Sequence, residues 1–247
     1  MRIKLVSHNV YWFQGHPFQG DRPETADPRI LKRLAALYLE QQADILCLQE
    51  IQSREVFNSI ALAAKMKGAF AEGRVYGQYG GCVCTRHEFE PEPPADCEPG
   101  ALERMALLCK VSAGQTALGI GNIHLTSGRQ SGKDRAGAAR LREMEGIFHL
   151  AGGKIDILCG DFNEHAGGGV SRFLEENGYT NAASLGGKRE IASLAGCTSG
   201  GDQIWVRESM KDSVADYGVI CDGFSISDVP GKKFLSDHLP VWIVVDV

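Results

Sequence analysis

A short apolar run of strand character, residues 155–159, ends in the polar tetrapeptide Gly160-Asp161-Phe162-Asn163. Positions two apart in an extended chain face the same way, so Asp161 and Asn163 can point at one target while Phe162 turns into the core. Open α/β folds place their chemistry at the carboxyl ends of such buried strands. The alternative is an ordinary turn, because Gly, Asp and Asn are all turn formers.

Other strand-like runs carry polar residues at their ends in the same manner. An asparagine and a glutamate follow two runs, a histidine closes another, and an aspartate and an Asp-His pair precede two more: Asn9, Glu50, His124, Asp202 and Asp237-His238. Each could have an ordinary structural role by itself, since Asp202 could belong to a hairpin turn and His124 could be a satisfied core histidine. Together they favour one shared site.

Composition narrows the class of protein. The chain has 247 residues, which suits a single domain spanning 1–247 with a sizeable core. Its net charge of −5 argues against bulk electrostatic binding to duplex nucleic acid, but it permits a metal that bridges an acidic protein to an anionic substrate. No apolar run has the length of a signal-peptide core or a transmembrane helix, so we expect a cytoplasmic protein without a transmembrane segment.

The eight cysteines match no zinc pattern, and most of them lie in apolar strand-like runs. We therefore expect reduced, buried thiols that behave as small apolar side chains. This also favours an intracellular location.

The hydrophobic pattern alternates between strands and helices. It predicts helices near residues 28–38, 54–67, 135–150 and 170–177, and strands at 3–10, 43–49, 70–76, 81–86, 105–111, 116–125, 203–206, 217–221 and 240–245. The proline-rich piece 89–100 is expected to be a surface loop. The alternation indicates an α/β protein with two sheets packed face to face and helices on the outside.

The polar residues lie in six segments: Ser7-His8-Asn9-Val10, Leu48-Gln49-Glu50, Asn122-Ile123-His124-Leu125, Gly160-Asp161-Phe162-Asn163, Gly201-Asp202-Gln203-Ile204 and Ser236-Asp237-His238-Leu239-Pro240. In this order they resemble the motif set of the endonuclease/exonuclease/phosphatase superfamily, the DNase I-like fold. The resemblance implies a four-layer α/β/β/α sandwich with its site at one end of the two sheets. It also implies a divalent metal, usually Mg²⁺ with Mn²⁺ as an alternative, and hydrolysis of a phosphate ester by in-line attack of water.

The resemblance implies roles on the metal and water side of the site. Glu50 would bind the metal, with Asn9 giving an amide oxygen to the metal or an amide N–H to the phosphate. Asp237 would be a further ligand, directly or through water. Asp161 would position or deprotonate the attacking water. Asn163 would hold that water or a phosphate oxygen.

It also implies roles for the histidines. Asp202 would fix the tautomer of His238 and raise its pKa, so that His238 donates to the phosphoryl oxygens. His124 would donate to the phosphate or assist the leaving oxygen. Which histidine acts as the general acid stays open.

Departures from the family pattern concern the substrate. Tyr11 stands where the abasic-site endonuclease branch carries an aspartate, and His124 is more similar to the DNase I, sphingomyelinase and inositol-phosphatase side. The loop 11–27 carries Trp12, which could stack on a base or cover a leaving group. A cluster of basic residues after His124 could bind the substrate, or it could be an ordinary solvated loop and helix start: Arg129, Lys133 and Arg135.

The sequence thus predicts a metal-dependent phosphodiesterase, a nuclease of endo or exo type, that acts on nucleic acid or nucleotides. A phosphomonoesterase or a lipid-headgroup phosphodiesterase on the same scaffold is the nearest alternative. A catalytically silent binding module is disfavoured because Glu50, Asp161 and His238 are all present. No obligate protein partner is evident.

Overall fold

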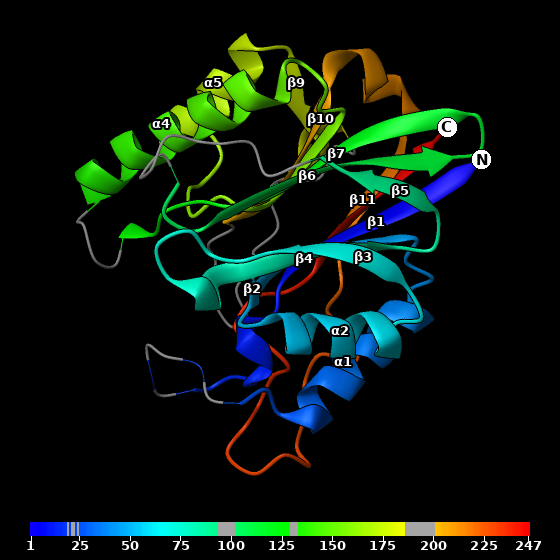
Figure 1. Cartoon of the computed structure of the whole chain (residues 1–247), viewed down its shortest axis with the longest axis vertical. Coiled ribbons are helices and arrows are strands. Elements are labelled where there is room, and N and C mark those ends of the chain that lie inside the picture. The colour runs from blue at the N-terminus through cyan, green and yellow to red at the C-terminus, as the bar shows by residue number, and fades with distance from the viewer. Residues whose placement is uncertain (19, 21–22, 24, 93–101, 129–132, 186–200) are drawn as a thin grey trace.

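The computed structural model describes residues 1–18, 20, 23, 25–92, 102–128, 133–185 and 201–247. Two mixed sheets, each of six strands in the described part of the chain, pack face to face. Helices cover both outer faces, so that the layers follow one another from α4 and α5 through the two sheets to α1 and α2 (Figure 1). This confirms the predicted α/β/β/α sandwich.

The first sheet joins the two ends of the described chain. Its strand order is β11 (Val214–Val219), β12 (Val241–Asp246), β1 (Arg2–Asn9), β2 (Ile45–Ile51), β4 (Gly80–Thr85) and β3 (Lys67–Ala71). Strands β1 and β2 are parallel, whereas β12 and β4 run antiparallel to them. Helices α1 (Pro28–Glu40) and α2 (Arg54–Ala63) cover its outer face. Both helices begin at a capped residue, since the side chains of Asp27 and Ser53 accept hydrogen bonds from backbone N–H groups of the first turn.

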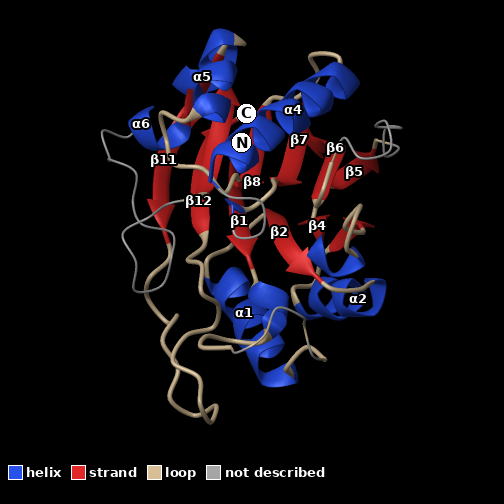
Figure 2. Cartoon of the chain, turned by 90° about the vertical axis from the view of Figure 1, so that its left-hand side faces the viewer, coloured by secondary structure: helices blue, strands red, loops and turns tan. Residues whose placement is uncertain are grey.

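The second sheet is built from the middle of the chain. Its strand order is β5 (Glu88–Pro91), β6 (Met105–Ala113), β7 (Thr116–His124), β8 (Ile157–Asp161), β10 (Asp202–Arg207) and β9 (Tyr179–Asn181). Strands β7 and β8 are parallel, and β6 and β10 are antiparallel to their partners in this pair. Helices α4 (Lys133–Ala151) and α5 (Gly169–Glu176) lie over its outer face, and the short α6 (Ala182–Leu185) follows β9 (Figure 2).

Three apolar clusters fill the spaces between the four layers. The middle cluster, between the sheets, contains Leu5, Ile157 and Ile243, and the two outer clusters join each sheet to its helices. Because both faces of each central strand are buried, these strands are nearly continuous apolar runs. The cysteines within them are buried and free, as predicted: Cys47, Cys82, Cys84, Cys109 and Cys159.

Two local predictions were wrong. The strand predicted at 70–76 is β3 at Lys67–Ala71, because β3 pairs with β4 only as far as Ala71 opposite Gly81, and the chain then leaves the sheet. The predicted loop 89–100 begins as the edge strand β5, where Pro91 is tolerated because an edge position need not donate a hydrogen bond. Residues 93–100 lie outside the described part. Among the described residues, no helix is both long and apolar enough to cross a membrane.

Strand direction sets where the polar residues gather. The carboxyl ends of β1, β2, β7 and β8 and the amino ends of β4, β6, β10 and β12 lie at the same end of the sandwich, since the antiparallel partners run the opposite way. Residues that follow the first group or precede the second therefore meet there.

Candidate active site

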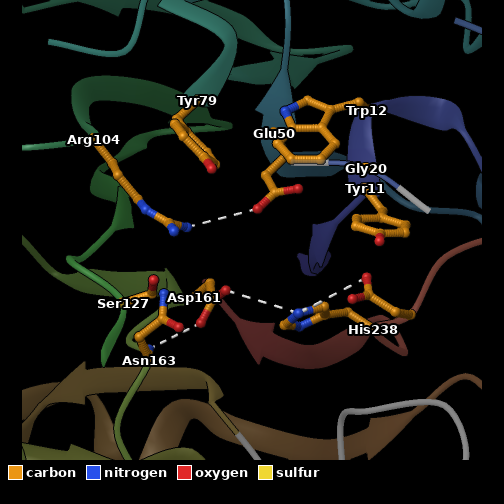
Figure 3. A pocket seen from close by; sticks show the side chains of 11 residues that line it. Tyr11, Trp12, Gly20, Glu50, Tyr79, Arg104, Ser127, Asp161, Asn163 and His238 are labelled. Carbon is orange, nitrogen blue, oxygen red and sulfur yellow. Dashed lines mark hydrogen bonds and ion pairs between the residues drawn. The ribbon is translucent and has the colours of Figure 1, made fainter. Parts of the chain in front are cut away.

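A cavity of about 320 Å³ opens at this end of the two sheets (Figure 3). Its walls come from both sheets and from the loop that follows β1. The lining residues are Tyr11, Trp12, Gly20, Glu50, Tyr79, Arg104, Ser127, Asp161, Asn163, Asp237 and His238.

The backbone around this cavity adopts conformations that are rare for residues other than glycine. The turn Tyr11–Phe13 has φ values of 49°, 51° and 57°, Glu50 has 59° and Asn163 has 50°. A left-handed backbone conformation costs free energy for residues other than glycine. It persists where the surrounding structure stabilises it, and such residues cluster at functional sites. Glu50 also lies in a β-bulge between β2 and β4, a feature that re-aims a side chain.

Gly160 shows why a glycine precedes Asp161. Its φ is 142°, and a Cβ at this position would overlap the carbonyl oxygen of Ile123 on the neighbouring strand β7. Only glycine therefore permits the close approach that brings Asp161 beside the end of β7.

Asp161 is the most highly connected carboxylate of the site. Its Oδ2 accepts a hydrogen bond from Asn9 Nδ2 at 3.1 Å and lies 3.3 Å from His124 Nε2, and its Oδ1 accepts from the backbone N–H of Asn163 at 2.9 Å. Burial would raise the pKa of this carboxyl, but His124 and the charge of His238 outweigh burial and hold the pKa well below its usual range. Asp161 is therefore ionised at neutral pH.

His238 faces Asp161 from the first sheet. Its Nδ1 donates to Asp202 Oδ2 at 2.7 Å, and its Nε2 lies 3.9 Å from Asp161 Oδ2 and 4.0 Å from Asp237 Oδ1. Burial would lower the pKa of His238, but the three carboxylates together raise it well above its usual value. The ring is thus a cation whose orientation Asp202 fixes, and this contact joins the two sheets.

Glu50 offers a carboxylate oxygen that the described residues leave unsatisfied. Its Oε1 lies 3.6 Å from Arg104 Nη1, whereas its Oε2 is buried without a hydrogen-bond partner among them. Burial, opposed by the attraction of Arg104 and reinforced by the nearby charge of Asp237, raises the pKa of Glu50 to about 7. A buried, unpartnered carboxylate oxygen beside a second carboxylate is a donor set that suits a hard divalent cation.

A second set of side chains also has the spacing of metal ligands. Single ligand atoms of Asp161, Asp202 and His238 lie within 4.8 Å of one another. Two of these residues already satisfy each other through the Asp202–His238 hydrogen bond, so we propose Glu50 and Asp237 as the residues that would hold a metal. Asn9 adjoins them, although its Oδ1 also accepts the backbone N–H of Tyr11 at 3.1 Å.

This assignment predicts a pH-dependent metal affinity. A cation competes with the proton on Glu50, so we expect the affinity for Mn²⁺ to rise about tenfold per pH unit up to the raised pKa of about 7 and then to level off. Isothermal titration calorimetry between pH 5.5 and 8.5 measures it. Glu50→Gln should bind weakly with a flat profile over this range, and the exposed Glu176→Gln should behave as the wild type. An equally steep profile in Glu50→Gln would place the metal elsewhere.

His124 lies beneath the cavity rather than in its wall. The side chain is completely buried, its Nδ1 has no partner in the described part of the chain, and its Nε2 contacts Arg104 and Asp161. Burial, and then the positive charge of Arg104, lower the pKa of His124 to about 4, so the ring is neutral at pH 7. In this position it supports Asp161 and Arg104 from below.

Arg104, a nearly buried cation in the cavity wall, was not predicted from the sequence. It contacts Glu50 and His124, and its guanidinium lies 4.2 Å from the centroid of the Tyr79 ring. Both Arg104 and Tyr79 come directly before antiparallel strands, β6 and β4. Since Met105 pairs with His124, a charged residue just before an antiparallel strand was the signal that could have found Arg104.

The predicted substrate-binding residues are placed unequally. Trp12 lines the cavity, but it is only 4% exposed: its ring packs between Tyr11 and Tyr79, each 5.5 Å away between centroids, and its Nε1 donates to Gln78 O. Trp12 thus builds a rigid wall and offers no free stacking face. Of the basic cluster, Arg135 is exposed near the start of α4 and does not line the cavity, and the rest lie outside the residues whose side chains are described: Arg129 and Lys133.

Comparisons with known proteins agree with this geometry. The sequence profile of the Endonuclease/Exonuclease/phosphatase family matches residues 6–238. No curated protein sequence matches the chain. Among solved structures, it is similar to an AP endonuclease from Archaeoglobus fulgidus, with 18% identity, 99% and 100% of the two chains covered and a TM-score of 0.73.

Two further solved structures share the fold at a similar level of sequence identity. A D. rerio TDP2 complexed with single strand DNA product has 15% identity and a TM-score of 0.71, with 100% and 99% of the chains covered. A family protein from Bacteroides thetaiotaomicron has 15% identity, the same coverage and a TM-score of 0.74. The profile match spans the segments that supply every candidate residue from Asn9 to His238, and the chain therefore belongs to the endonuclease/exonuclease/phosphatase family.

Proposed function

We propose that this chain is a divalent-metal-dependent phosphodiesterase that hydrolyses a phosphodiester of a nucleic acid or nucleotide. Members of its family are hydrolases that act on phosphate esters. The observation that carries the proposal is the pairing of an ionised Asp161 with a cationic His238, beside a Glu50 carboxylate oxygen that has no partner among the described residues.

The metal would be held by Glu50 and Asp237, with Asn9 as a neighbour. A bound divalent cation would supply Lewis-acid polarisation of a phosphoryl oxygen. The remaining chemistry belongs to the side chains of the chain itself.

Asp161 orients the attacking water. Its pKa lies below the usual range, so it is ionised and accepts hydrogen bonds, and its two oxygens are held by Asn9 and Asn163. A fixed acceptor selects one orientation of the water for in-line attack and takes the proton of the water as its oxygen bonds to phosphorus and the ester P–O bond breaks.

His238 and Arg104 stabilise the negative charge that grows on the phosphoryl oxygens. Both are cations that line the cavity, and both are oriented by fixed contacts, His238 by Asp202 and Arg104 by the Tyr79 ring. Donors that are already in place when the charge develops lower the barrier without reorganisation. His238, as the protonated group nearest Asp161, is also placed to protonate the leaving oxygen.

The size and the lining of the cavity favour a substrate with a small or flat group beside the phosphate. Its volume of about 320 Å³ is at the lower end of ligand-binding cavities, and one wall is the aromatic cluster Tyr11, Trp12 and Tyr79. The similar AP endonuclease and TDP2 structures favour nucleic acid, the second because it is a complex with a single strand DNA product. The net charge of −5 favours single strands or nucleotides over long duplexes.

A substrate panel tests this proposal. With Mg²⁺ or Mn²⁺, we expect the wild type to hydrolyse bis-p-nitrophenyl phosphate and single-stranded DNA in preference to p-nitrophenyl phosphate, and to lose activity with EDTA. Preference for the monoester would favour the phosphomonoesterase, and preference for sphingomyelin or a phosphoinositide the lipid-headgroup alternative. If the protein hydrolysed none of these esters in a metal-dependent manner, the catalytically silent binding module would be the remaining alternative.

A further inference from the structure

His8 is a completely buried histidine that the proposed chemistry does not use. It lies in β1 directly before Asn9, with Nδ1 2.6 Å from the hydroxyl of Tyr38 on α1 and Nε2 2.9 Å from the backbone carbonyl of His238. A carbonyl oxygen only accepts, so Nε2 carries the proton and donates it. In the neutral ring Nδ1 is then the acceptor, and the Tyr38 hydroxyl donates to it.

Water does not replace these hydrogen bonds. His8 and Tyr38 both have no exposed surface, and the ring edge of Phe224 packs against His8 with centroids 5.7 Å apart. Burial lowers the pKa of His8 to about 3, so the ring is neutral at ordinary pH. The hydroxyl therefore selects the tautomer that presents N–H to His238.

Four polar contacts hold the segment around His238. The Ser236 hydroxyl donates to the carbonyl of Asn9 at 2.8 Å, and Asp202 accepts from the ring of His238 at 2.7 Å. His8 supplies the third contact, on the backbone carbonyl of His238. The fourth contact is the backbone N–H of His238, which donates to Ser236 Oγ at 3.2 Å. Asp202 thus fixes the ring, whereas His8 and Ser236 hold the main chain from which the ring projects.

We propose that Tyr38 and His8 are positioning residues for His238, through the chain Tyr38 O–H to His8 Nδ1 and His8 Nε2–H to the His238 carbonyl. This inference rests on the proposed function, because it assigns the pair to the residue that faces the phosphate. Loss of the N–H donor would free the His238 backbone, and a displacement of about 1 Å can lower turnover about 100-fold even where binding is kept.

The test compares variants that remove only these contacts. We expect His8→Phe to lower kcat for bis-p-nitrophenyl phosphate by about 10- to 100-fold, and Tyr38→Phe by about 5- to 10-fold, with KM within about twofold of the wild type. His8→Gln, whose amide N–H can replace Nε2–H, should recover kcat to within about threefold. Tyr179→Phe is the matched control, since it also removes a buried 2.6 Å hydroxyl contact, to Ile155 O, away from the cavity.

The outcomes separate this inference from the proposed function. Equal kcat in Tyr38→Phe and Tyr179→Phe, or no recovery in His8→Gln compared with His8→Phe at equal Tm, would overturn the positioning role while wild-type activity stands. The NMR signals of the His238 ring test the positioning role without depending on catalysis. We expect them to shift or broaden in Tyr38→Phe and not in Tyr179→Phe, and unchanged signals would overturn the inference even for a protein without phosphoesterase activity.

Discussion

Replacement of His238 by glutamine is expected to lower kcat for a phosphodiester by about 100- to 1,000-fold, the range found when one preorganised donor to a developing oxyanion is removed. Glutamine keeps a hydrogen-bond donor but has no positive charge, so it cannot match the increase of charge on the phosphoryl oxygens. Steady-state kinetics measure the effect. His149→Gln, an exposed histidine on α4, is the control and should retain full activity. If His238→Gln kept more than a tenth of the wild-type kcat, His238 would have no part in the chemistry.

Asp202, the hydrogen-bond partner of His238, allows a second test of the role of the positive charge on His238. Asp202 raises the pKa of the imidazole, so Asp202→Asn should move the alkaline limb of the kcat–pH profile to lower pH. The sign follows from the cationic form being the active one, since a lower pKa means loss of the proton at lower pH. A profile that stays in place would show that the charge of His238 does not limit turnover.

Replacement of Asp161 by asparagine is expected to lower kcat by about 100- to 10,000-fold, the range for loss of a positioned group that handles the proton of the nucleophile. The amide is nearly isosteric, but it turns one acceptor into a donor. That donor would face Asn9 Nδ2, which now donates to the carboxylate. We therefore expect both lost water orientation and a local mismatch, measured by kinetics and by Tm.

Thermal unfolding distinguishes these two effects. The pKa of Asp161 is depressed in the folded protein, so its stabilisation is present above the unfolded pKa near 3.9 and is lost as pH falls through the folded value. The Tm difference between the wild type and Asp161→Asn should therefore shrink below about pH 4. Asp222→Asn, at an exposed position, should leave both kcat and Tm unchanged. Full activity in Asp161→Asn would remove this residue from the mechanism.

The sequence predicted the layers of the fold because strand and helix periods are local signals. It predicted the gathering of Asn9, Glu50 and Asp161 because each follows a buried apolar strand, and the carboxyl ends of such strands are where α/β folds build their sites. The chain brings Asn163 to the cavity in a different way from the one predicted. Its backbone is left-handed, with φ of 50°, so a turn and not a continued strand brings it to the cavity.

Other parts of the site depend on contacts that no short window contains. Arg104 has meaning only once β6 is known to run antiparallel to β7, because this register places it beside His124. The burial of Trp12 depends on Tyr79, which lies 67 positions later in the chain and packs against its ring. An aromatic residue in a loop could therefore be recognised as part of the site but not as a wall of it.

His238 and Asp202 belong to different sheets, and the strand that follows His238, β12, inserts between β11 and β1. During synthesis, a chain made only as far as residue 236 has Glu50, Arg104 and Asp161, but it has neither His238 nor β12, the strand that joins β11 to the rest of the first sheet. Hydrolysis would thus begin only after residues up to 246 have emerged and both sheets have docked.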